Sequence, residues 1–116
     1  MRPPRPLTIG VVAGEPSGDA LGGHLLAALR QALPTVRFEG IAGKAMQAAG
    51  AESWYPLEAL TVWGHWAALR RYRPIIGIRQ ALLKRWLANP PDLFIGIDAP
   101  GFNLDLEVAL RAAGIP

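Results

Sequence analysis

The sequence contains no cysteine, which excludes a disulfide framework and any metal site built on thiolates. It also lacks an apolar run near the roughly 18 residues that a membrane-spanning helix needs. The basic start "MRPPRP" is followed only by the apolar run "LTIGVVAG", which fits a strand better than a secretory signal. We therefore expect a cytoplasmic protein, and its 116 residues fit one small domain.

Acidic residues are missing from one long segment. Between Glu58 and Asp92 the chain has no Asp or Glu, but it has three of the four tryptophans and six basic residues: Arg70, Arg71, Arg73, Arg79, Lys84 and Arg85. Tryptophan and arginine favour the membrane–water boundary, and a basic helix with a broad apolar face can lie in that boundary. An ordinary core helix with one solvated face is an equally open interpretation. A nucleic-acid patch is disfavoured because no recognised nucleic-acid module accompanies the segment.

Short apolar runs alternate with stretches of helical periodicity along the chain. The runs predict strands at residues 7–13, 36–43, 51–56 and 92–98. The periodic stretches predict helices at residues 19–33, 44–50, 74–88 and 104–114. Pro74 is expected in the first turn of its helix, and Gly50 and Gly114 are expected to end theirs. The alternation indicates an α/β fold, a Rossmann-like parallel sheet with flanking helices. The last residues stand where another strand would start, so we expect part of a larger fold.

Two loops are candidates for chemistry, residues 14–19 and 98–103. Ligands of open α/β sheets bind beyond the carboxyl ends of the strands, so the loops face one crevice if the first and fourth strands are neighbours. Ser17 and Asp19 can cap the helix that follows the first loop, and Glu15 adds a second acid. The loop therefore suits a hydroxyl-rich ligand such as a sugar better than a phosphate. The alternative, a helix cap and a solvated acid, stays open.

Asp98 follows the apolar run "FIGI" where the crevice would open. A carboxylate among apolar neighbours can have a raised pKa and act as a general base, or it can cap local backbone N–H groups. Asp105 and Glu107 lie two residues apart on a helix and do not face each other, so a solvated face is the better interpretation. His24 is expected on a helix surface, and neither His24 nor His65 has partners at metal-ligand spacing.

Three stretches together resemble the lipid A disaccharide synthase family: "VAGEPSGDALGGHLLAALR", "FEGIAGKAMQAAGAESWYPLEALTVWGH" and "PPDLFIGIDAPGFNLDLE". The resemblance implies an inverting glycosyltransferase with the two-domain GT-B fold. Such an enzyme transfers diacylglucosamine from UDP to diacylglucosamine 1-phosphate at the inner face of the cytoplasmic membrane. It uses no metal or other cofactor. Residues 1–116 would form the acceptor-side domain, without the C-terminal domain that binds the UDP-sugar.

The resemblance also assigns residues. Asp98 would be the catalytic base. The substrate-binding residues would be Gly14, Glu15, Ser17, Gly18, Asp19 and Asn103. A membrane-facing patch would include Val62, Trp63, Trp66, Leu69, Arg70, Arg71, Ile75 and Ile76. The expected partners are the two lipid substrates and an anionic membrane surface, with a homodimer possible and no nucleic acid.

Two other functions remain open at this point. One is a non-catalytic, truncated fragment that binds a lipid or a protein partner through the basic, aromatic segment. The other is a small flavodoxin-like regulator that binds a nucleotide.

Overall fold

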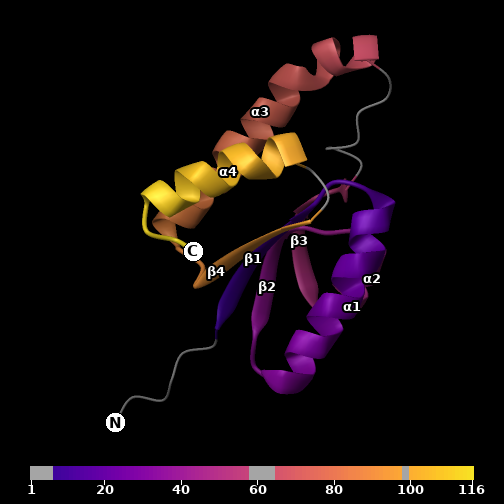
Figure 1. The fold of residues 1–116 in the computed structure, drawn as a ribbon, viewed down its shortest axis with the longest axis vertical. Coiled ribbons are helices and arrows are strands. Elements are labelled where there is room, and N and C mark those ends of the chain that lie inside the picture. The colour runs from indigo at the N-terminus through magenta and orange to yellow at the C-terminus, as the bar shows by residue number, and fades with distance from the viewer. Residues whose placement is uncertain (1–6, 58–64, 98–99) are drawn as a thin grey trace.

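The structure is a computed structural model that describes residues 7–57, 65–97 and 100–116, with the side chains of 65–75 and 100–102 left out of that description. Its centre is a parallel sheet of four strands in the order β3-β2-β1-β4 (Figure 1). The strands are β1 (Thr8–Ala13), β2 (Arg37–Ile41), β3 (Ala51–Tyr55) and β4 (Leu93–Ile97). All three neighbouring pairs are parallel, so the predicted Rossmann-like α/β fold is confirmed.

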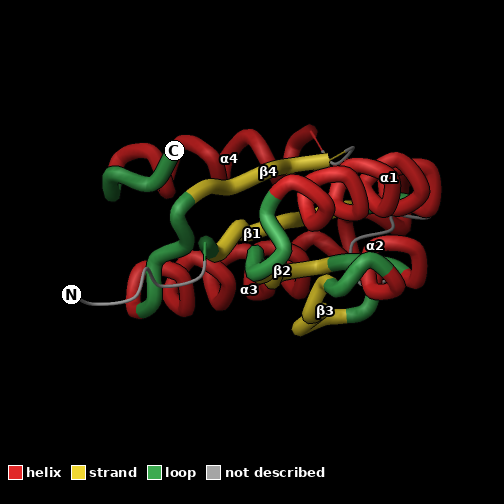
Figure 2. Tube along the Cα trace, turned by 90° about the horizontal axis from the view of Figure 1, so that it is seen from below, coloured by secondary structure: helices red, strands yellow, loops and turns green. Residues whose placement is uncertain are grey.

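Helices cover both faces of the sheet (Figure 2). They are α1 (Pro16–Ala32), α2 (Lys44–Ala48), α3 (His65–Ala88) and α4 (Pro100–Ala112). Leu26 of α1 and Met46 of α2 are buried in one cluster of core side chains. Trp86 of α3 and Leu110 of α4 are buried in a second cluster. The alternation of side chains along each strand supplies both clusters, since successive residues point to opposite faces.

Prolines mark two of the helix starts, but not the one that the sequence suggested. Pro16 and Pro100 each occupy the first residue of a helix, where the missing N–H would have no intrahelical partner. Residues 16–19 and 100–103, predicted to lie in loops, therefore belong to the first turns of α1 and α4. The prediction that α3 begins at Pro74 was wrong, because α3 runs from His65 through that residue. An interior proline removes one backbone hydrogen bond and strains the preceding turn, yet the helix continues on both sides of it.

Both predicted glycine ends are confirmed. Gly50 follows α2 with φ 106°, and Gly114 follows α4 with φ 86°, a left-handed conformation in which glycine avoids the steric penalty of a Cβ. Within the described residues, no helix is long and apolar enough to cross a membrane.

Trp86 is fully buried, and one glycine on each of two strands beneath it leaves room for the indole ring. A Cβ on Gly10 of β1 would lie 2.9 Å from the indole, and one on Gly40 of β2 would lie 3.2 Å from it. Phe94 of β4 packs edge-on against the indole at 5.6 Å between ring centroids. The two glycines therefore create the space for the Trp86 side chain of α3.

Candidate functional site

The first and fourth strands end side by side. β1 and β4 are parallel neighbours, and Ala13 pairs with Ile97 at the last position of both strands. The prediction that these strands are adjacent is confirmed, so the first loop starts beside the end of β4. Asp98, the residue after Ile97, lies outside the described residues.

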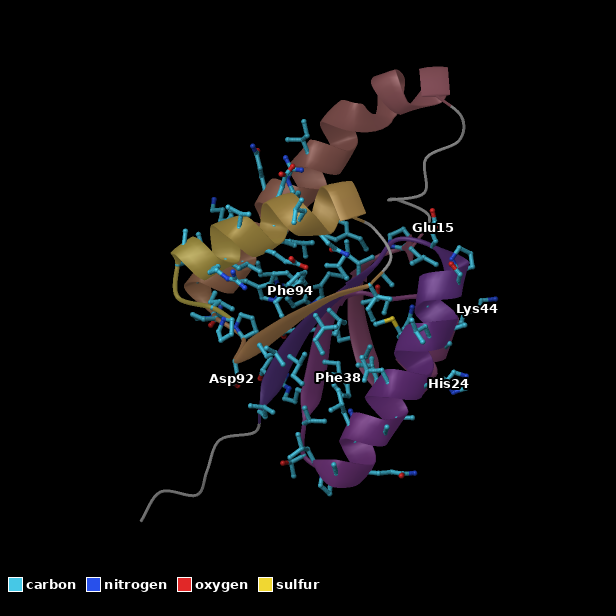
Figure 3. All side chains as sticks on the ribbon, viewed as in Figure 1. Glu15, His24, Phe38, Lys44, Asp92 and Phe94 are labelled. Atoms are coloured by element: carbon cyan, nitrogen blue, oxygen red, sulfur yellow. The ribbon has the colours of Figure 1, made fainter. Side chains whose placement is uncertain are left out.

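Glu15 is the N-cap residue of α1, with an extended backbone (φ −145°, ψ 157°). Its carbonyl oxygen accepts the hydrogen bond from the Asp19 N–H at 3.0 Å, and its side chain makes no capping bond. Figure 3 shows the Glu15 side chain on the loop at this end of the sheet, pointing outward. Glu15 and Ser17 are both exposed. A carboxylate and a hydroxyl are thus exposed close to the ends of β1 and β4, and both suit a ligand with hydroxyl groups.

Asp19 does not cap its own helix, contrary to the prediction. Its two carboxylate oxygens accept hydrogen bonds from the backbone N–H groups of Ala45 (2.9 Å) and Met46 (3.0 Å) in the first turn of α2. An N-cap side chain normally makes these bonds, but the N-cap residue of α2 is Gly43. A Cβ on Gly43 would lie 2.5 Å from the Asp19 carboxyl carbon. Asp19 therefore occupies the place of the missing side chain and joins α1 to α2.

The two glycines of the first loop are buried together with Asp19. Gly14 and Gly18 are buried and Asp19 is 7% exposed, whereas Pro16 is exposed. The motif "GEPSGD" thus combines exposed residues at positions 15–17 with buried residues at positions 14, 18 and 19. The loop therefore has a buried base and an outer surface that carries the polar groups of Glu15 and Ser17.

Asn103 is the buried polar residue of α4, 4% exposed. Its Nδ2 donates to the carbonyl oxygen of Val12 at 3.4 Å, while its Oδ1 has no hydrogen-bond partner among the described residues. A Cβ on Gly96 would lie 2.8 Å from the Asn103 Cγ. The side chain therefore lies over the Val12–Gly96 pair of β1 and β4, one position before the ends of both strands.

The other expected sites are placed as follows. His24 is exposed on α1, as predicted (Figure 3). Asp105 and Glu107 are exposed, and Asp105 pairs with Arg79 at 2.9 Å, so the solvated face is confirmed. Ile76 is half-buried on α3. Of the other residues expected to face a membrane, Val62 and Trp63 lie outside the described residues, and five belong to α3 with side chains that are not described: Trp66, Leu69, Arg70, Arg71 and Ile75.

Sequence reasoning missed two glycines that shape the site. Gly43 makes room for the Asp19 carboxylate, and Gly96 makes room for the Asn103 amide. Glycine within a strand pattern can signal a close approach by another group, and Gly96 interrupts the apolar run "LFIGI". The identity of the approaching side chain was not readable from the sequence.

Comparison with known proteins gives a match over nearly the whole chain. The family model described as Lipid-A-disaccharide synthetase matches residues 9–116. The chain belongs to this family. The lipid-A-disaccharide synthase of Dechloromonas aromatica (strain RCB) is 57% identical over 107 residues, which are 92% of this chain and 28% of that protein. That of Escherichia coli O8 (strain IAI1) is 51% identical over 111 residues, covering 96% of this chain and 29% of that protein. The chain thus spans less than a third of the length of these relatives.

Proposed function

We propose that this chain is the acceptor-side domain of a lipid A disaccharide synthase, a glycosyltransferase of lipid A biosynthesis. Family membership over residues 9–116 carries the proposal. In the proposed enzyme, the UDP-sugar is bound mainly by a second domain formed by sequence outside these residues. The share of the relatives that the chain spans, 28% in the first of them, supports this division. The fold would then be the N-terminal half of a GT-B enzyme.

The proposed reaction joins two diacylglucosamine units. Asp98 takes the proton of the acceptor's 6-hydroxyl, and the acceptor oxygen forms a bond to C1 of the donor sugar. The bond from C1 to the UDP oxygen breaks with inversion, and UDP leaves with the bonding electrons. General-base catalysis typically contributes about 10²–10⁴-fold to such a step.

The first loop would position the sugars. Glu15 and Ser17 are exposed and can accept hydrogen bonds from sugar hydroxyls. Gly14, Gly18 and Asp19 are buried and would hold the loop in place. Asn103, over the Val12–Gly96 pair, would hold the start of α4 near the ends of β1 and β4. Orientation of the reacting groups is a major source of rate in bimolecular transfer.

A chimera provides the test. Residues 9–116 replace the matching segment of the Dechloromonas aromatica relative, and UDP release is measured with UDP-diacylglucosamine and diacylglucosamine 1-phosphate. We expect turnover from the chimera and none from the isolated 116-residue chain. Asp98→Asn should lower kcat by about 10²–10⁴-fold, whereas Asp105→Asn, on the exposed face of α4, should leave kcat unchanged. An inactive but folded chimera, or an active Asp98→Asn variant, would contradict the proposal.

We also propose peripheral association with the inner face of the cytoplasmic membrane through residues 62–83. The first turns of α3 extend beyond the end of the sheet (Figure 1), and this part of the chain has three arginines at positions 70, 71 and 73. Near an anionic surface each basic residue contributes about 1 kcal/mol, which salt screens. Co-sedimentation with anionic and neutral vesicles over a salt series tests this. Arg70→Gln/Arg71→Gln should remove the salt-sensitive part, and equally weak binding to both vesicles at low salt would refute the proposal.

A further inference from the structure

Asn103 combines three properties that a purely structural residue does not need. It is 4% exposed, its single hydrogen bond to Val12 is long at 3.4 Å, and its Oδ1 has no partner among the described residues. Leaving a buried acceptor unpaired is unfavourable, and an apolar residue of the same shape can be neutral or stabilising at such a place. Stability alone therefore does not explain an asparagine at this position.

The surroundings of Asn103 are adapted to it. Val12 accepts its hydrogen bond, and Gly96, the partner of Val12 across the two strands, leaves space for its amide. This pair directly precedes the last pair of β1 and β4, Ala13 and Ile97. Asn103 thus connects the beginning of α4 with the ends of β1 and β4.

A direct contact with substrate does not fit this geometry. The Oδ1 atom is fully buried, whereas Glu15 and Ser17 are exposed on the first loop. A ligand that contacts Glu15 and Ser17 would therefore reach the first loop without reaching the Asn103 amide.

We propose that Asn103 is a positioning residue of the transfer reaction. It holds the first turns of α4 against the ends of β1 and β4, the two strands that lead into residues 14–19 and Asp98. The role rests on the proposed function of these residues, but the contacts that define it are within the chain itself.

The main variant is Asn103→Leu, which keeps the volume and removes the amide. In the active chimera we expect kcat to fall by about 10²-fold, the scale of a misplacement near 1 Å, with KM within about threefold and a melting temperature equal to or above that of the parent. A purely structural role predicts a lower melting temperature with kcat retained, and a substrate contact predicts a raised KM. Either result would overturn the proposal.

Gly96→Ala tests the contact between Gly96 and Asn103 by changing the glycine instead of the asparagine. Its methyl group would lie 2.8 Å from the Asn103 Cγ, so it should displace the amide and lower kcat as Asn103→Leu does. Combined with Asn103→Ala, which frees the space, it should add no further loss of kcat, because residues in contact are not additive. Val108→Ala, at a position of α4 that is 66% exposed, is the control and should leave kcat unchanged. Full additivity of the pair would contradict the contact.

Amide hydrogen exchange tests the positioning role of Asn103 without a measurement of activity. In the 116-residue chain, Asn103→Leu should accelerate amide exchange at residues 12–19 and 95–97 relative to the parent, while exchange in β2 stays the same. If the parent chimera is inactive, the proposed function fails and this measurement still decides the role of Asn103. Unchanged exchange at the strand ends would overturn it.

Discussion

The two faces of the sheet are built in different ways. On the α1–α2 face, polar side chains bond directly to backbone groups: Asp19 to the first turn of α2, and Arg30 to the carbonyl oxygens of Val36 and Ala49. Glycines there bring backbones close together. On the α3–α4 face, apart from the Asn103 bond to the Val12 carbonyl oxygen, large side chains pack against one another. Trp54 and Trp86 lie 5.7 Å apart between centroids, and the Trp54 indole N–H has no hydrogen-bond partner among the described residues.

The contrast teaches which changes each face tolerates. A face that is stabilised by the packing of large side chains loses stability when atoms are removed, because a cavity remains. A face held by close backbone contact is damaged when atoms are added, because the helices have to separate. Each face can therefore be tested with a change that the other should accept.

The largest effect is expected from Trp86→Ala. Removing this fully buried side chain should lower the free energy of unfolding by about 3–5 kcal/mol, a large fraction of the stability of a small domain. Urea denaturation of the 116-residue chain measures it. Leu87→Ala, on the next residue and 48% exposed, is the control and should change the free energy by less than about 1 kcal/mol. Equal losses from both variants would show that Trp86 is not the centre of this face.

Gly23→Ala should be the next most damaging change. A Cβ here would lie 2.9 Å from the Ala45 Cβ and 3.1 Å from its backbone carbonyl carbon, so α1 and α2 have to move apart. We expect a loss of about 1–3 kcal/mol. The same substitution at Gly77 of α3, which meets nothing within 4 Å, should stabilise by about 0.5–1 kcal/mol through helix propensity. Two changes of the same sign would refute the contrast between the faces.

Asp19→Ala removes the cap that α2 receives from α1. The expected loss is about 1–2 kcal/mol, measured by urea denaturation. Gly43 has φ −89°, which any residue can adopt, so Gly43→Asp supplies a cap within α2 itself. Gly43→Asp should therefore restore stability in the Asp19→Ala background and reduce it alone, because the wild-type Asp19 carboxyl group fills that space. The same effect in both backgrounds would disprove the capping role.

The smallest effect concerns pH. Burial raises the pKa of Glu39 on β2, the Trp86 side chain and Arg37 act against this rise, Glu52 adds to it and Arg85 opposes it. A raised pKa in the folded state means that the folded chain binds the proton more tightly. The contribution of Glu39 to stability is therefore greatest below its unfolded pKa and is lost as pH rises through the folded one.

Glu39→Gln consequently should raise the melting temperature at pH 7 and give no such gain near pH 4. Glu107→Gln, an exposed change of the same kind on α4, is the control. A gain that is constant across the pH range would contradict the assignment to the carboxyl group.

The hydrophobic periodicity of the sequence was sufficient to predict the fold, because buried strands and amphipathic helices have characteristic local patterns of apolar residues. The strand at Thr8–Ala13 and the glycine after α2 were both readable from the sequence. The start of α3 could not be predicted, because the sequence around a proline does not tell whether it lies in the first turn of a helix or, like Pro74, in the interior. The partner of Asp19 was not readable either. A capping residue is normally close in sequence to its helix, whereas this carboxylate bonds to residues 26 and 27 positions away.

The long-range cap of α2 has a consequence for folding kinetics. A helix of five residues is too short to form alone, since helices under about 12 residues are marginal in water. Its first turn receives the Asp19 carboxylate only after α1 has docked. We expect α2 to form after the folding transition state, with φ-values near zero for Asp19→Ala. The substitution should then accelerate unfolding and leave the folding rate almost unchanged. The hydrogen bonds from α2 to Asp19 would therefore control the lifetime of the folded conformation of residues 14–19.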